Sequence, residues 1–232
     1  TCSTTAKKTG ALWADTEEST MNELILCMEL IGTVAFAVSG AMTALRRQMD
    51  LLGVLILGLI TAVGGGILRD LLLGITPPKI FDDPLTVCVA LAASAVAFLP
   101  PVCRTLARST LLFDRILLAA DSVGLAIFTV VGEQAAFGHL PEENWFAVAL
   151  LGAITGVGGG VLRDTLAGNV PYIFRKHIYA LAALAGALVW LICHLLLDDT
   201  TALLLGSAVV IAIRLLASHF RWSLPKARIP EE

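Results

Sequence analysis

The chain has 232 residues, of which 57% are hydrophobic and 15% are charged, with a formal net charge of −3. Soluble domains carry about 25% charged residues, so this composition excludes an ordinary soluble domain and indicates a membrane protein. No block of basic residues is interleaved with aromatic ones, so we expect no nucleic-acid partner. The four histidines are scattered and form no metal or nucleophile motif, so we expect neither an enzyme nor a cofactor.

The first 20 residues are polar and lack the apolar core of a signal peptide. The apolar sequence begins only after Met21. We therefore expect residues 1–20 to be a disordered extension or a remnant of cloning, outside the fold.

From there on, apolar stretches of about 20 residues recur, long enough to cross a bilayer core of about 30 Å as helices. The sequence predicts an all-α membrane protein with seven transmembrane helices. We expect these helices at 22–45, 51–75, 85–103, 112–133, 145–168, 178–197 and 201–219.

Charge alternates between successive connections. Those near 46–47, 104–115 and 175–176 and the C-terminal tail are basic, whereas those near 82–83, 142–143 and 198–199 are acidic. Basic connections stay on the cytoplasmic side of a membrane. We therefore expect the N-terminus outside the cell and the C-terminus in the cytoplasm.

Two distant stretches of the sequence are near copies of each other. "LGLITAVGGGILRDLLLGITP" at 57–77 and "LGAITGVGGGVLRDTLAGNVP" at 151–171 share 14 of 21 residues without a gap, and 29–40 resembles 121–132. The domains that we expect are repeat 1 at 21–108, repeat 2 at 109–199, a seventh helix at 200–220 and a tail at 221–232. Because each repeat holds three spans, the two must cross the membrane in opposite directions, as an inverted repeat.

Each copy carries three consecutive glycines within a span. Each glycine costs about 1 kcal/mol in a helix relative to alanine, so we expect the second and fifth helices to be broken there. Such a break would free the backbone carbonyls of Gly64 and Gly158 as transient ligands for a monovalent cation. The alternative is close helix packing, which small residues at a spacing of four favour. The glycines concerned are Gly64, Gly65, Gly66, Gly158, Gly159 and Gly160.

An arginine and an aspartate follow each glycine run, at Arg69–Asp70 and at Arg163–Asp164. Ionisable groups within a span indicate a functional site, although a structural ion pair or snorkelling to the surface is the alternative. Adjacent residues point about 100° apart on a helix. The neighbouring aspartate therefore need not neutralise its arginine, and a pair between Arg69 and Asp164 stays open.

Further polar residues are duplicated. Glu29 and Asp121 are symmetric acids that could attract cations or pair with an arginine. Thr61 and Thr155 precede the glycines, and could line a polar path or hydrogen-bond to their own helix. Arg214 has no counterpart, and we expect it to pair with one of the acids.

These features together resemble the bacterial trimeric intracellular cation (TRIC) channel family, over about residues 21–220. The resemblance implies a homotrimer in the bacterial inner membrane, among membrane lipids. It also implies a pathway in each protomer where the second and fifth helices meet, carrying potassium or other monovalent cations. Bacterial members are also described as glycine transporters. The leading hypothesis is therefore a potassium channel, and the alternative is a small amino-acid transporter that uses the same residues.

Overall fold

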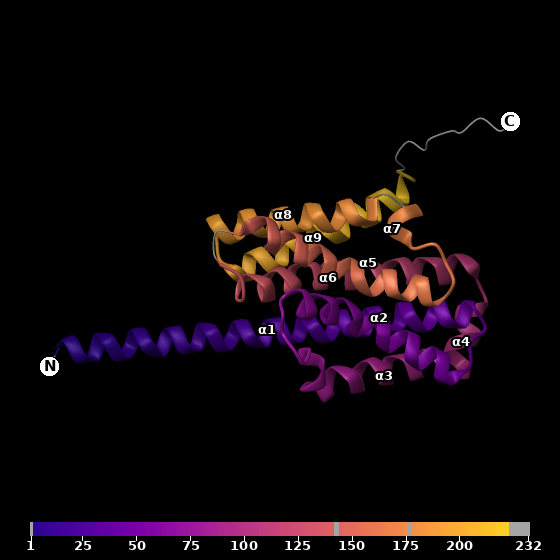
Figure 1. Cartoon of the computed structure of the whole chain (residues 1–232), viewed down its shortest axis with the longest axis horizontal. Helices are drawn as coiled ribbons and strands as arrows, with labels where there is room; N and C mark the ends of the chain where they lie inside the picture. The colour runs from indigo at the N-terminus through magenta and orange to yellow at the C-terminus, as the bar shows by residue number, and fades with distance from the viewer. Residues whose placement is uncertain (1, 142–143, 176–177, 223–232) are drawn as a thin grey trace.

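The computed structural model describes residues 2–141, 144–175 and 178–222, with side chains from residue 19 onward except at 106, 107 and 175. The loop charges expected at 142–143 and 176, and tail residues 223–232, lie outside the described residues. The described chain is a bundle of helices (Figure 1). In chain order they are α1 (Cys2–Arg46), α2 (Leu51–Leu72), the short 3-10 helix η1 (Lys79–Phe81), α3 (Pro84–Phe98), α4 (Pro100–Ala107), α5 (Thr110–Phe137), α6 (Trp145–Leu166), α7 (Tyr172–Arg175), α8 (Ile178–Leu196) and α9 (Asp199–His219).

In the described part of the chain, six helices are long and apolar enough to cross a membrane. They are the 19–46 part of α1, and α2, α5, α6, α8 and α9. The expected third span is divided into α3 and α4 at Leu99, because a residue before a proline is pushed out of the helical conformation and two prolines follow. α3 has 15 residues and is about 22 Å long, short of a bilayer core of about 30 Å. Seven complete spans are therefore not confirmed.

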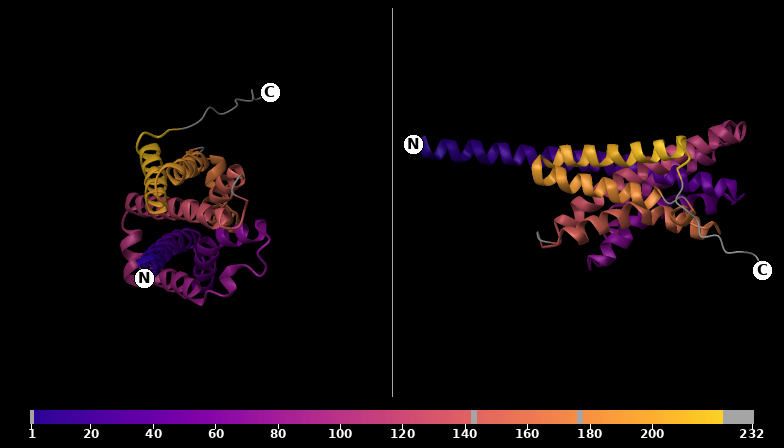
Figure 2. Two further views of the ribbon diagram at one scale, coloured as in Figure 1. Left: turned by 90° about the vertical axis from the view of Figure 1, so that its left-hand side faces the viewer. Right: turned by 90° about the horizontal axis from the view of Figure 1, so that it is seen from above.

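The backbone of α1 is helical from Cys2, where we expected a disordered extension. The first 20 residues contain no proline and a single glycine, so nothing in them forces the helix to end. This part of α1 projects beyond the rest of the bundle (Figures 1 and 2).

The two repeats pack against each other in opposite directions. α1 packs on α2 and α3, α5 packs on α6 and α8, and the pairs α1–α5 and α2–α6 join the repeats. Gly32 lies against Ile127, and Gly124 lies against Phe36. Residue numbers thus rise along α1 as they fall along α5. The first repeat occupies one side of the bundle and α8 and α9 the other (Figure 2, left).

The triple glycines do not break their helices. α2 and α6 are continuous through Gly64–Gly66 and Gly158–Gly160, so the expected breaks are wrong. A Cβ atom on Gly65 would overlap the carbonyl oxygen of Thr155, and one on Gly159 would overlap a carbonyl of α2. Glycine therefore lets the two backbones touch, and the packing of α2 on α6 offsets the helical cost of the glycines.

Candidate functional site

The Arg-Asp segments lie in the last turns of α2 and α6 and form equivalent local ion pairs. Arg69 donates from Nε and Nη2 to Asp70 Oδ1 over 3.0 and 2.8 Å. Arg163 donates from Nε to Asp164 Oδ1 over 2.8 Å. The long arginine side chain bends back to its neighbour, although the two Cα–Cβ bonds diverge. Each pair thus forms within one repeat, and the open alternative of a cross-repeat pair is not realised.

Each of these aspartates also holds the loop that follows its helix. Asp70 Oδ2 accepts a hydrogen bond from the Lys79 amide, and Asp164 Oδ2 accepts one from the Tyr172 amide, both at 2.9 Å. Both helices end at a glycine of positive φ, at 73° for Gly74 and 67° for Gly168. The duplicated motif therefore also builds a helix end and its loop.

Repeat 2 extends its pair into a buried cluster, the inner cluster, which we define as Asp121, Arg163, Asp164, Arg214, Ser39 and Tyr179. Arg163 Nη1 donates to Asp121 Oδ1 and to Ser39 Oγ, each over 2.6 Å. Arg214 Nη2 donates to Asp121 Oδ2 over 3.1 Å, which confirms the expected partner for Arg214. Arg163 is 1% exposed. Two arginines face two aspartates, so the cluster is neutral overall.

The equivalent place in repeat 1, the outer cluster, is open. We define it as Glu29, Arg69, Asp70, Lys79 and Asp83. These residues line a cavity of about 250 Å³. No ion pair joins Glu29 to Arg69 in the described structure, whereas Asp121, its counterpart, binds two arginines. The two halves of the site therefore differ although their motifs are copies.

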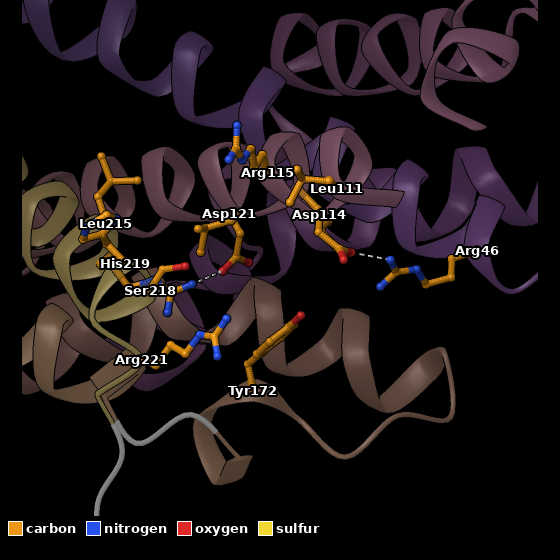
Figure 3. A pocket seen from close by; sticks show the side chains of 13 residues that line it. Arg46, Leu111, Asp114, Arg115, Asp121, Tyr172, Leu215, Ser218, His219 and Arg221 are labelled. Carbon is orange, nitrogen blue, oxygen red and sulfur yellow. Dashed lines mark hydrogen bonds and ion pairs between the residues drawn. The ribbon is translucent and has the colours of Figure 1, made fainter. Parts of the chain in front are cut away.

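A larger cavity of about 680 Å³ opens beside the inner cluster (Figure 3). Asp121, Arg214 and Tyr172 line it, and Arg46 pairs with Asp114 on its wall. Burial raises the pKa of Tyr172, so its phenol stays neutral. Glu29 and Arg46 are 17 residues apart on α1, which is about 25 Å along a helix. The two cavities thus lie at opposite ends of the bundle.

The remaining predicted residues lie in the helix contacts. Thr61 Oγ1 donates to Leu57 O over 2.5 Å, and Thr155 Oγ1 donates to Leu151 O over 2.6 Å. Both hydroxyls therefore bond to their own helix, one of the two open alternatives. The carbonyls of Gly64 and Gly158 lie within continuous helices, where each accepts the amide four residues later. They are not freed as cation ligands, which corrects that expectation.

Sequence reasoning missed Ser39 and Tyr179. Ser39 is fully buried in α1 and Tyr179 is 1% exposed in α8. Tertiary packing alone brings Ser39 to Arg163 and the Tyr179 hydroxyl to within 3.4 Å of Asp121 Oδ1. The available signal was weak: Tyr179 is one of only two tyrosines in the chain.

Comparison with solved structures identifies the fold. A structure described as the basis for conductance through TRIC cation channels matches with a TM-score of 0.78 and 38% identity, over 89% of this chain and 98% of that one. This chain belongs to the TRIC family. The TRIC orthologue from Rhodobacter sphaeroides matches with a TM-score of 0.78 and 32% identity, over 86% of this chain and 99% of that one.

Sequence comparison agrees with membership of the TRIC family. A family model described as "Glycine transporter" matches residues 26–100 and 118–195, one stretch in each repeat. A UPF0126 membrane protein of Deinococcus radiodurans is 40% identical over 91% of this chain and 96% of its own length. The UPF0126 inner membrane protein YadS of Escherichia coli is 36% identical over 90% of this chain and 98% of its own length. The protein is therefore a multi-pass membrane protein of the TRIC fold.

Proposed function

We propose that this TRIC-family protein is a channel for monovalent cations, chiefly potassium. We further propose a homotrimer with one pathway per protomer, in the bacterial inner membrane, with the N-terminus outside and the C-terminus in the cytoplasm. The observation that carries the proposal is the likeness to solved TRIC cation channels, at 38% identity and a TM-score of 0.78.

The pathway that we propose joins the two cavities. It begins at the outer cluster, where Glu29, Asp70 and Asp83 supply carboxylate oxygens. It continues along the contact between α2 and α6 and ends in the larger cavity beside Asp121 and Arg214. Carboxylates at both ends would concentrate cations.

The inner cluster is the barrier in this proposal. Arg163 is 1% exposed and lies between Asp121, Asp164 and Ser39. A fixed guanidinium repels a passing cation. Conduction therefore requires Arg163 and Arg214 to move with their aspartates, so that the neutral cluster opens as a unit.

Potassium flux from liposomes that contain the purified protein tests the channel directly. We expect a voltage-driven flux that is independent of external glycine, and a native mass of three chains. An absence of flux at every voltage would overturn the channel, and a monomeric mass would overturn the trimer.

A second function, transport of a small amino acid such as glycine, is favoured by one specific observation. Arg163 Nη2 and Arg214 Nε are buried and have no hydrogen-bond partner in the described structure. These two free guanidinium N–H groups could donate to the carboxylate of an amino acid, and an oxygen of the aspartate beside them could accept a hydrogen bond from its ammonium group. Saturable uptake of labelled glycine, lost in Arg163→Ala and Arg214→Leu, would support this function and replace the channel.

A further inference from the structure

Glu133 is a buried acid that the proposed pathway does not use. It lies one turn before the end of α5 and is 0% exposed. Neither of its carboxylate oxygens has a hydrogen-bond partner in the described structure. Its side chain lies against α6, where a Cβ atom on Gly152 would overlap Glu133 Cγ and come within 3.0 Å of its Cδ.

The fold does not require a carboxyl group at this place. Gly40 and Gly132 are equivalent in the two repeats, so the residue equivalent to Glu133 is Ala41. Ala41 is also 0% exposed. A methyl group therefore fills the same place in one copy of the unit, where the other copy has an acid.

No cation in the described structure neutralises Glu133. The charged and titratable groups on the helices packed against α5 have other partners or lie elsewhere. On α6, Arg163 and Asp164 begin 11 residues beyond Gly152 and pair with each other. The cations on the other helices have partners or lie elsewhere. Arg46 pairs with Asp114, Arg69 with Asp70, His194 with Asp199 and Arg214 with Asp121. Arg104 lies at the far end in α4, and His219 lines the larger cavity. Among the other titratable groups, Glu23 is exposed, Glu29 faces the outer cavity and Tyr179 bonds to Asp121.

An ionised carboxylate without a partner is unfavourable inside a membrane protein. The remaining way to neutralise Glu133 is to bind a proton. We propose that Glu133 is a proton-binding site, and that its bound proton stabilises the conformation in which α5 packs on α6 at Gly152.

A polar cluster beside Glu133 gives this proton an entrance. Gln134 follows Glu133 on α5, and its Nε2 lies 3.5 Å from Asp199 Oδ2. His194 Nδ1 lies 2.6 Å from Asp199 Oδ1. Asp199 begins α9 and its side chain is 36% exposed. Asp199 would therefore exchange the proton with water, at the end of the bundle opposite the inner cluster.

The sign of the pH effect follows from the burial. The packed conformation favours the protonated form of Glu133, so acid stabilises that conformation and alkali favours conformations in which the carboxylate reaches water. In the packed conformation Arg163 and Arg214 close the inner end. If the protein conducts potassium as proposed above, the flux should fall as the pH falls.

Infrared spectroscopy of the purified protein tests the bound proton without any assay of transport. We expect the carbonyl band of a protonated carboxyl group in the wild-type protein at neutral pH. Glu133→Gln should lose this band, and Asp114→Asn should keep it, because Asp114 is exposed. A wild-type protein without the band, or a Glu133→Gln protein that keeps it, would overturn the proposal.

The pH profile of potassium flux tests the coupling. Wild-type flux should fall at low pH, and Glu133→Gln should show a flat profile at the low-pH level, because glutamine mimics the protonated acid. His139→Gln is the histidine control, because His139 is exposed, contacts the carbonyl oxygen of Ala135 and lies outside this polar cluster. It should keep the wild-type profile. A Glu133→Gln protein that follows the wild-type profile would overturn the coupling.

Glu133→Ala separates a structural role from proton binding. Because Ala41 occupies the equivalent place, this variant should fold, and its unfolding temperature should no longer depend on pH as in the wild type. An unchanged pH dependence would contradict the proton site. A wild-type protein without flux at any pH would instead overturn the proposed channel. The infrared spectrum would still show whether Glu133 binds a proton.

Discussion

Single residues in this protein combine two structural tasks. Asp70 and Asp164 each neutralise a neighbouring arginine with one oxygen and hold the following loop with the other. The identity of the two motifs therefore has a structural cause, because the same bonds build a helix end and its loop in each repeat. The repeats differ in their acids, because Asp121 pairs with both Arg163 and Arg214, whereas in the described structure no ion pair joins Glu29 to Arg69.

Removing Arg163 should destabilise the protein far more than removing Arg69. In Arg163→Ala, Asp121 and Asp164 both lose a buried partner, and breaking a buried ion pair costs about 3–5 kcal/mol. Arg69 has a single partner beside an open cavity, so Arg69→Ala should cost less. Thermal unfolding in detergent measures both variants. Equal losses of stability in the two variants would show that the inner cluster stabilises the fold no more than the outer cluster does.

Replacing Arg214 should open the inner end. Asp121 keeps its bond to Arg163 in Arg214→Leu, so the protein should fold, and one positive charge leaves the wall of the larger cavity. We expect a higher potassium conductance in planar bilayers. Arg108→Leu removes an exposed arginine that does not line this cavity, and it serves as the control that should leave the conductance unchanged. Equal conductance in Arg214→Leu and the wild type would remove Arg214 from the barrier.

The sequence predicted which residues form the candidate site better than it predicted which of them contact one another. The duplication pointed to both Arg-Asp pairs and to both acids. Because Arg214 has no copy in the other repeat, it was expected to pair with one of these acids. Ser39 and Tyr179 were not predictable, because only tertiary packing brings Ser39 of α1 to Arg163 of α6 and Tyr179 of α8 to Asp121 of α5. The openness of the outer cluster was hidden too, since Glu29 and Asp121 differ by one methylene group.

At the scale of the helices, packing overrides local propensity. Three glycines in a row predict a break if the helix is considered alone, yet α2 and α6 are continuous because their backbones touch there. The third span shows the opposite error. Pro100 and Pro101 divide it, and this signal was visible in the sequence although the apolar run continues through it.

The glycines of one run should differ in their tolerance of alanine. A Cβ atom on Gly159 would overlap the carbonyl oxygen of Thr61, whereas the nearest atom to one on Gly66 is Arg69 Nη2 at 4.0 Å. Gly159→Ala should destabilise the protein by about 1–3 kcal/mol through overpacking. Gly66→Ala should be neutral or stabilise it by up to about 1 kcal/mol. Unfolding temperatures in detergent give the comparison, and equal effects would contradict the close contact.

At the scale of the whole molecule, the repeat predicted the architecture. Corresponding helices are antiparallel across the bundle, as three spans per unit require. The direction in which the bundle enters the membrane is a separate matter, because it depends on where the basic connections lie. That direction remains our prediction from charge alone.

Labelling with a membrane-impermeant thiol reagent tests this orientation. In a background without the native cysteines, Asp82→Cys should react in intact spheroplasts, because its loop is predicted to face outward. Arg108→Cys should react only after lysis, since its loop is basic and predicted to be cytoplasmic. Both positions are exposed. The reverse pattern would invert the topology.

The contact of Gly65 and Gly159 joins two helices that run in opposite directions, and this has a consequence for ancestry. A repeat made as a separate chain could rebuild the contact only with a second copy inserted upside down. Such a chain would have to enter the membrane in both orientations in similar amounts. After the two copies were fused into one gene product, each could fix its own orientation by gaining or losing basic residues at its connections. The unequal clusters of the present protein record how far the two halves have since diverged.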